Sequence, residues 1–152
     1  MAGEYLEFTN NSTPALSGPN VNLMQQRIRT HINSIHGTEL YKNTSGGNVS
    51  QGITLSETID NFDFIEIYCG KSASQGLNIV KIDLSVSTKA NVLSYIQLSS
   101  SEVQFIVSRL SVSGTSLTQD NCQVMNISSS NIGIGTSTEM RVYKVIGYKI
   151  IE

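Results

Sequence analysis

The chain has 152 residues, a length that suits one domain with enough buried surface to fold without disulfides or metals. Only 14 % of the residues are charged and the net charge is −2, so there is no basic stripe of the kind that nucleic-acid binding needs. No apolar run approaches the roughly 18 residues of a membrane-spanning helix, and the N-terminus lacks the pattern of a secretory signal. We therefore expect synthesis in the cytoplasm, with no nucleic-acid partner and no membrane insertion.

Residues 1–16 are predicted to form an extended arm. Tyr5, Leu6 and Phe8 are apolar, and the polar stretch 9–13 follows them before Pro14. Such a segment is too apolar for a solvated tail and too short to fold alone. We expect an anchoring arm that becomes ordered only against a partner.

A helix is predicted over residues 19–36, within a segment 17–37. Ser17 or Gly18 can cap its start, and Pro19 suits the first turn because its missing N–H would have no partner there. Gly37 is a natural stop, since a residue without Cβ adopts the left-handed conformation easily.

The apolar positions of this helix form one stripe. Val21, Met24, Ile28, His31 and Ile35 follow alternating steps of three and four residues, the pattern of a coiled coil. A helix of about 18 residues is marginal alone in water, so it has to pack on something. Two arrangements satisfy that need: a bundle of helices from several copies on a symmetry axis, or an amphipathic helix that lies on its own β domain.

Beyond Gly37 the sequence changes to short strand patterns separated by turn signals, among them 45–48, 88–91 and 120–121. Their spacing of about ten residues predicts an antiparallel β-sandwich or barrel over 38–152. The clearest alternation places Val80, Ile82, Leu84 and Val86 on one face. The predicted strands are 38–43, 51–56, 62–69, 77–85, 92–98, 102–112, 115–118, 122–128 and 140–150.

Catalytic chemistry finds little support in the sequence. The only imidazoles, His31 and His36, belong to the predicted packing helix, and no nucleophile or orienting group accompanies either one. Asp60 and Asp63, with Glu57 nearby, could supply the two carboxylates of a glycosidase. The simpler interpretation is that they are solvated turn residues. We expect no enzyme activity.

Metal and cofactor sites are not indicated either. Cys69 and Cys122 each lie in a strand-like run; they could form a disulfide, but two buried thiols are the preferred interpretation. No spacing of His, Cys or acidic residues resembles a metal site. The sequence IGIG at 132–135 lacks the strand–turn–helix context of a phosphate loop, and it suggests a strand edge or bulge. No cofactor is expected.

Several segments resemble tail-fibre and baseplate proteins of phages that infect Gram-positive bacteria. The opening FTNNSTPALSGPNVN at 8–22 resembles their N-terminal segment, and MRVYKVIGYK at 140–149 resembles the last strand of their β-rich C-terminal domains. Between these ends, GITLSET at 52–58 followed by FIEIY at 64–68, and the hairpin LSVSGTSLT at 110–118, resemble the body of the same domains in the same order.

The resemblance implies a trimeric virion appendage with a receptor-binding C-terminal domain. It favours the bundle arrangement for the helix, with Val21, Met24, Ile28, His31 and Ile35 on the axis of a homotrimer. The arm with Tyr5, Leu6 and Phe8 would bind other virion proteins. A host cell-wall polysaccharide would bind at loop tips drawn from 71–75, 88–91 and 128–131, with an outward Tyr95 as a stacking face. The residues expected there are Lys71, Ser72, Ser74, Gln75, Lys89, Asn91, Tyr95, Ser130 and Asn131.

A second functional class fits the same resemblance. The chain could be a purely structural component of a baseplate, tail tip or head fibre, without receptor binding. The resembling domains usually end much longer fibre chains, whereas here the arm runs almost directly into the domain. The chain would then be either a short appendage or one part of a longer fibre.

Overall fold

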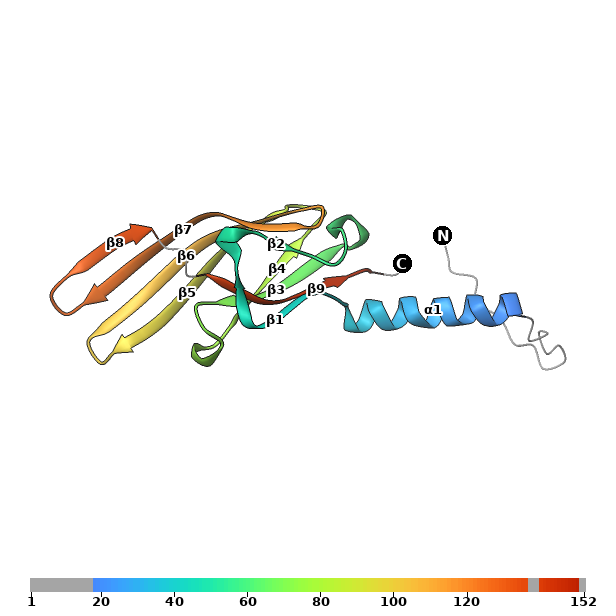
Figure 1. The fold of residues 1–152 in the computed structure, drawn as a ribbon, viewed down its shortest axis with the longest axis horizontal. Helices are drawn as coiled ribbons and strands as arrows, with labels where there is room; N and C mark the ends of the chain where they lie inside the picture. Colours follow the sequence, from blue (N-terminus) through green and yellow to red (C-terminus); the bar gives the residue numbers. More distant parts are fainter. Residues whose placement is uncertain (1–17, 137–139, 151–152) are drawn as a thin grey trace.

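The computed structural model of the chain describes residues 18–136 and 140–150, with side chains described from residue 21 except at 33–36 and 75 (Figure 1). The fold is mainly β, as predicted, with one α-helix and two antiparallel sheets that form a sandwich. Three 3₁₀ turns lie in the connections: η1 (Val49–Gln51), η2 (Ile59–Asn61) and η3 (Ala73–Gln75). The longer elements are α1 (Gly18–His36), β1 (Thr38–Asn48), β2 (Ile53–Thr54), β3 (Phe64–Gly70), β4 (Asn78–Asp83), β5 (Lys89–Ser99), β6 (Glu102–Ser113), β7 (Ser116–Ser128), β8 (Ile132–Thr136) and β9 (Arg141–Tyr148).

Helix α1 confirms the predicted bounds to within one residue and ends at Gly37, whose φ of +71° is the left-handed conformation expected of a helix stop. The helix extends away from the sandwich (Figure 1), and β9 is the strand that it contacts most. Met24, Ile28 and Ile32 are consequently 42–50 % exposed. The alternative in which the helix lies on its own β domain is therefore wrong for this structure.

The first sheet, sheet A, has the strand order β1-β9-β3-β4. Strand β9 lies in its interior and pairs antiparallel with both β1 and β3. Gly147 of β9 is opposite Thr38 on one side and Ile65 on the other, and the Phe62 ring occupies the place where a Cβ would point. A glycine is needed here because that Cβ would lie only 2.6–2.9 Å from three carbons of the ring.

The second sheet, sheet B, has the order β2-β7-β6-β5, and β8 pairs with the far end of β7. Strand β7 is continuous, which corrects the predicted break at 120–121. Asp120 is instead the extra residue of a bulge, because Arg109 opposes Asn121 while Leu110 opposes Gln119. The polar pair that suggested a turn marks an irregularity within one strand.

Two further strand predictions need correction. The turn signal at 45–48 does not end β1, which continues to Asn48 with an irregular register against β9. The predicted alternation around β4 holds for Val80, Ile82 and Leu84, which all pack on the core. It fails for Val86, because the strand ends at Asp83 and Val86 lies in the following turn, 81 % exposed. A turn held by the Ser87 N–H and the Asp83 carbonyl oxygen (2.9 Å) is the reason for the early end.

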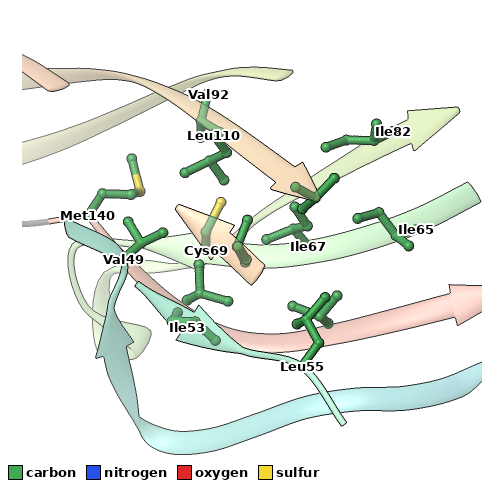
Figure 2. Packing of buried hydrophobic residues seen from close by; sticks show 14 of the residues in the cluster. Val49, Ile53, Leu55, Ile65, Ile67, Cys69, Ile82, Val92, Leu110 and Met140 are labelled. Carbon is green, nitrogen blue, oxygen red and sulfur yellow. The ribbon is translucent and has the colours of Figure 1, made fainter. Parts of the chain in front are cut away.

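The core lies between the two sheets. Ile65 and Ile67 from sheet A meet Val92 and Leu110 from sheet B, and the connections add further apolar residues such as Met140 (Figure 2). Both cysteines are buried thiols and are not joined to each other, as the preferred interpretation held. Burial raises the pKa of the Cys69 thiol to about 12.

Candidate functional site

A hollow of about 350 Å³ runs along the outer edge of sheet B. One wall is the start of β4 with the residues before it, Gly76, Leu77 and Asn78, and the other wall is the segment 94–97 of the edge strand β5. We call this hollow the β5 groove. Its volume is at the lower end of the range for small-ligand sites. Backbone groups, the Asn78 amide and the Ser94 hydroxyl place hydrogen-bonding groups beside apolar carbon.

The loop 71–76 brings the first wall of the groove into position. It leaves β3 at Gly70 and closes on Gly76, which has a φ of +89° and donates its N–H to the Ala73 carbonyl oxygen (3.3 Å). A Cβ at Gly70 would lie 3.1 Å from the Gly76 carbonyl oxygen, so a side chain there would crowd the loop's closure. The hydroxyls of Ser72 and Ser74 share a hydrogen bond of 2.8 Å. Two glycines thus define a small polar loop next to β5.

Behind this loop, polar side chains face inward from sheet B. Lys71 Nζ donates to Gln104 Oε1 (2.8 Å), and Gln104 Nε2 donates to Asn126 Oδ1 (2.8 Å). Gln104 and Ser94 are buried at inward positions where strands of a sandwich normally carry apolar residues. The chain of amides ties the loop to the middle of sheet B, which makes the first wall of the groove firm.

The structure brings only some of the predicted site residues together. Tyr95 lines the β5 groove, and Lys71, Ser72 and Ser74 belong to the loop that precedes its first wall. The predicted loop contains η3, and the side chain of Gln75 is outside the described part. Tyr95 meets the condition for a stacking face, because it points outward and is 71 % exposed, with its ring centroid 6.4 Å from that of Phe105.

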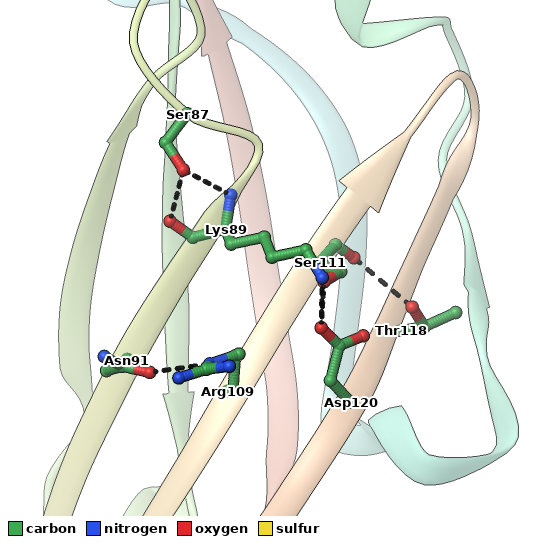
Figure 3. A network of polar contacts seen from close by, with 7 residues as sticks. All are labelled: Ser87, Lys89, Asn91, Arg109, Ser111, Thr118 and Asp120. Carbon is green, nitrogen blue, oxygen red and sulfur yellow. Dashed lines mark hydrogen bonds and ion pairs between the residues drawn. The ribbon is translucent and has the colours of Figure 1, made fainter.

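The prediction of a loop at 88–91 is wrong, because β5 begins at Lys89. Lys89 Nζ binds Asp120 Oδ2 (2.8 Å), and Asn91 Oδ1 accepts a hydrogen bond from Arg109 Nε (3.2 Å), as Figure 3 shows. Ser111 also donates to Asp120 (2.6 Å), and these contacts hold the pKa of Asp120 below its usual range. The hydrogen-bonding groups of these side chains pair with one another near the start of β5, at the end of the strand that is remote from the β5–β6 turn.

The segment 128–131 is a turn, as predicted, and it forms the tip of the β7–β8 hairpin. The Ser128 N–H donates to the Asn131 carbonyl oxygen (2.9 Å), and the Asn131 N–H donates to Ser128 Oγ (3.2 Å). Ser130 and Asn131 are exposed at this tip. The tip lies at the end of the sandwich remote from α1 (Figure 1), together with the β5–β6 turn.

A second hollow, of about 580 Å³, lies at the end of sheet A where β3 begins and β9 ends, and it contains one carboxylate of the considered glycosidase pair. Asp63 accepts from the Ile150 N–H (2.6 Å) and from Lys149 Nζ (3.2 Å), and these contacts lower its pKa. Asp83, in the same hollow, has a lowered pKa through its bonds from Ser85. A glycosidase acid needs a raised pKa, and the pKa of both groups is lowered. Asp63 is instead suited to holding residues 149–150 in place, and Asp83 to holding the turn at Ser85.

The remaining predicted residues have simpler outcomes. The arm residues Tyr5, Leu6 and Phe8 lie outside the described residues, as does the side chain of Ile35. His31 is exposed on α1, and Val21 is half-buried. Within 18–136 and 140–150, no group of three His, Cys, Asp or Glu residues could hold a metal ion, and no helix is long and apolar enough to cross a membrane.

Sequence reasoning missed most of the β5 groove. Leu77, Asn78 and Gln97 carry no motif, and only the fold brings them together. Ser94 and Gln104 did offer a signal, because each is a polar residue at an inward position of an otherwise alternating strand.

Comparisons with known proteins assign no family to this chain. No family model matches it, and no curated protein is significantly similar to it.

Proposed function

We propose that this protein is a trimeric appendage of a phage virion whose β-sandwich attaches to glycans on the surface of a Gram-positive host. The observation that carries the proposal is the position of α1. An apolar stripe lies uncovered on a helix that projects from one end of the sandwich, while polar hairpin tips lie at the other end (Figure 1). Such a molecule has one end suited to joining copies and another suited to contact with a target.

The exposed stripe supports association through α1. A helix of 19 residues gains too little from its own hydrogen bonds to persist alone, so cover for Met24, Ile28 and Ile32 has to come from outside this chain's sandwich. Three copies packed around an axis would bury Met24 and Ile28 in one seam with Val21, His31 and Ile35, and Ile32 would lie at the edge of this seam. The seam contains no acidic residue, so copies can approach without repulsion between carboxylates.

The β5 groove supports glycan binding. Its polar groups are amides, hydroxyls and backbone groups without a net charge, which suits the hydroxyls of a neutral sugar. The tip 128–131 adds further hydroxyl and amide groups at the same end of the sandwich (Figure 1). One weak site per copy becomes useful when several copies bind one cell surface.

The assignment to a virion rests on the resemblance of the segments 8–22, 52–68, 110–118 and 140–149 to phage tail-fibre and baseplate proteins. Under the proposal, the arm 1–16 anchors the trimer to a neighbouring virion protein. Nothing in the described hollows calls for catalysis, so the proposal assigns no enzyme activity.

The trimer is tested by light scattering of the full chain. We expect three times the monomer mass, and a monomer for Ile28→Asp, because three carboxylates would enter an apolar seam. Glu39→Gln, which alters an exposed carboxylate outside the stripe, serves as the control and should remain a trimer. A monomeric unmutated protein would refute the axial helix.

Glycan binding is tested with the labelled protein on a panel of Gram-positive cells and on an array of cell-wall polysaccharides. We expect the double variant Asn78→Ala with Gln97→Ala to lose binding by about tenfold or more, since each removes hydrogen-bonding groups worth about 1 kcal/mol. The matched control, Asn61→Ala with Gln51→Ala, alters exposed amides outside the groove and should bind normally.

The structural alternative makes a different prediction. If the protein is only a baseplate, tail-tip or head-fibre part, it will bind no cell and no glycan, yet it will enter particles through the arm 1–16. Deletion of 1–16 should then prevent incorporation and leave the thermal stability of the trimer nearly unchanged. Binding to cells by the isolated protein would favour receptor attachment instead.

A further inference from the structure

The outer face of sheet B has two halves of opposite character. The half near the start of β5 is polar, and its side chains pair with one another in the network of Lys89, Arg109, Ser111 and Asp120 (Figure 3). From Leu93 onward, toward the hairpin tips, the outward positions become apolar. The polar half is complete by itself, whereas the apolar half has no cover among the residues that the structure describes.

Three rows of directly opposed residues build the apolar half, each crossing β5, β6, β7 and β8. The middle row is Tyr95, Phe105, Met125 and Ile134. Opposed residues of an antiparallel pair point to the same side, so the rows form one continuous surface. We define the apolar face by its six most exposed members, which are between 37 and 71 % exposed: Leu93, Tyr95, Val107, Met125, Ile132 and Ile134.

The exposed area of the apolar face is close to that of a protein–protein interface. The exposed fractions of the six residues add up to about three and a half fully exposed residues, which corresponds to an exposed area of roughly 500–700 Å². That is at or above the roughly 300–600 Å² of the largest apolar patch on a typical monomer. It approaches the roughly 800 Å² that each partner buries in an interface of standard size.

The absence of charge in these three rows favours a second copy of the chain as the occupant. The rows contain only apolar residues with Gln97, Gln123 and Thr136 at their margins, and no Asp, Glu, Lys, Arg or His. Where the patches of three copies surround one symmetry axis, each patch lies beside its own duplicates, so an uncharged surface avoids meeting its own charge. Under the proposed trimer, the exposed apolar stripe on α1 is also covered by copies of the chain.

We propose that the apolar face is a contact surface between copies of this chain, so that the trimer is held at the sandwich as well as at α1. This inference rests on the proposed trimer and adds a second contact to it. Tyr95 is then covered by the neighbouring copy instead of stacking on a sugar. The β5 groove, which Tyr95 borders, opens beside the junction between two copies.

The decisive experiment measures dissociation of the full-length trimer by analytical ultracentrifugation over a dilution series. The double variant Val107→Lys with Ile134→Lys should raise the concentration at which the trimer dissociates by about tenfold or more, because charges replace buried apolar contacts. The matched control, Val86→Lys with Ile79→Lys, changes the same residue types at other exposed sites and should leave dissociation unchanged. Circular dichroism verifies the fold of each variant.

A second measurement does not depend on a destabilising change. Ile134→Cys treated with a short bis-maleimide should yield covalently joined copies, whereas Ile79→Cys, on sheet A, should yield monomers only. The buried Cys69 and Cys122 do not compete for the reagent. A stable trimer with unchanged dissociation in the lysine variant and no link through position 134 would overturn the inference while leaving the trimer intact. A monomeric unmutated protein would refute the proposed trimer as well.

Discussion

Replacement of Gly147 by alanine tests the packing of the last strand most directly. The new Cβ would lie 2.6–2.9 Å from three carbons of the Phe62 ring, where ordinary carbon contacts are about 3.5–4.0 Å. The backbone cannot retreat, because Gly147 is opposite Thr38 of β1 and Ile65 of β3. The buried Phe62 ring must therefore move by about 1 Å. Overpacking of this kind costs about 1–3 kcal/mol, a large share of the roughly 5–15 kcal/mol that holds a domain together.

Urea unfolding followed by circular dichroism, at one fixed protein concentration, measures the cost of Gly147→Ala. Phe62→Leu supplies the control, because a smaller side chain leaves room for the Cβ. In that background the alanine should cost less than in the parent, with a coupling of about 0.5–3 kcal/mol between the two sites. A loss below about 0.5 kcal/mol for Gly147→Ala alone, or equal losses in both backgrounds, would refute the explanation.

Three further predictions follow from the described contacts. Gly37→Ala should destabilise the junction of helix and sandwich by about 1–2 kcal/mol or more, seen in thermal melts, because φ is +71° and the Cβ would collide with Ile146. Asp63→Asn should have a lower free energy of unfolding than the parent at neutral pH, because a lowered pKa stabilises the fold only while the carboxyl is ionised. This difference should disappear as the pH falls below the ordinary carboxyl pKa of 3.8. A difference that stays constant across that range would contradict the contact with Ile150. Cys69, with a pKa raised to about 12, should react with iodoacetamide at pH 8 only after unfolding, and rapid native labelling would show that the site is open.

Much of the fold was predictable because its signals are local. The helix ends where Gly37 can adopt a left-handed conformation, and the alternation at Val80 and Ile82 reports two faces of a strand. The errors arose where local signals competed with long-range pairing. The pair at 120–121 suggests a turn, yet pairing with β6 continues on both sides and absorbs Asp120 as a bulge. The same pairing draws Lys89 into β5.

The candidate site was predictable only in part. The loop 71–75 carries a clear signal, since glycines at 70 and 76 enclose small polar residues. The opposite wall, 94–97, belongs to a strand that is distant in the sequence, and no local pattern states which loop will lie beside it. The apolar face was hidden for another reason. Outward apolar residues such as Leu93 and Ile134 become one surface only when the register of four strands is known.

The interior position of β9 has a consequence for how the chain is made. Sheet B is built mainly from neighbouring hairpins, so it can form while synthesis continues. Sheet A cannot close until residues 141–148 have emerged, because until then β1 has no partner in the sheet and β3 pairs only with β4. During that interval two open strand edges are available for mispairing with other nascent chains. Completion of the sandwich therefore requires translation past residue 148, so a chain that stops earlier leaves sheet A open.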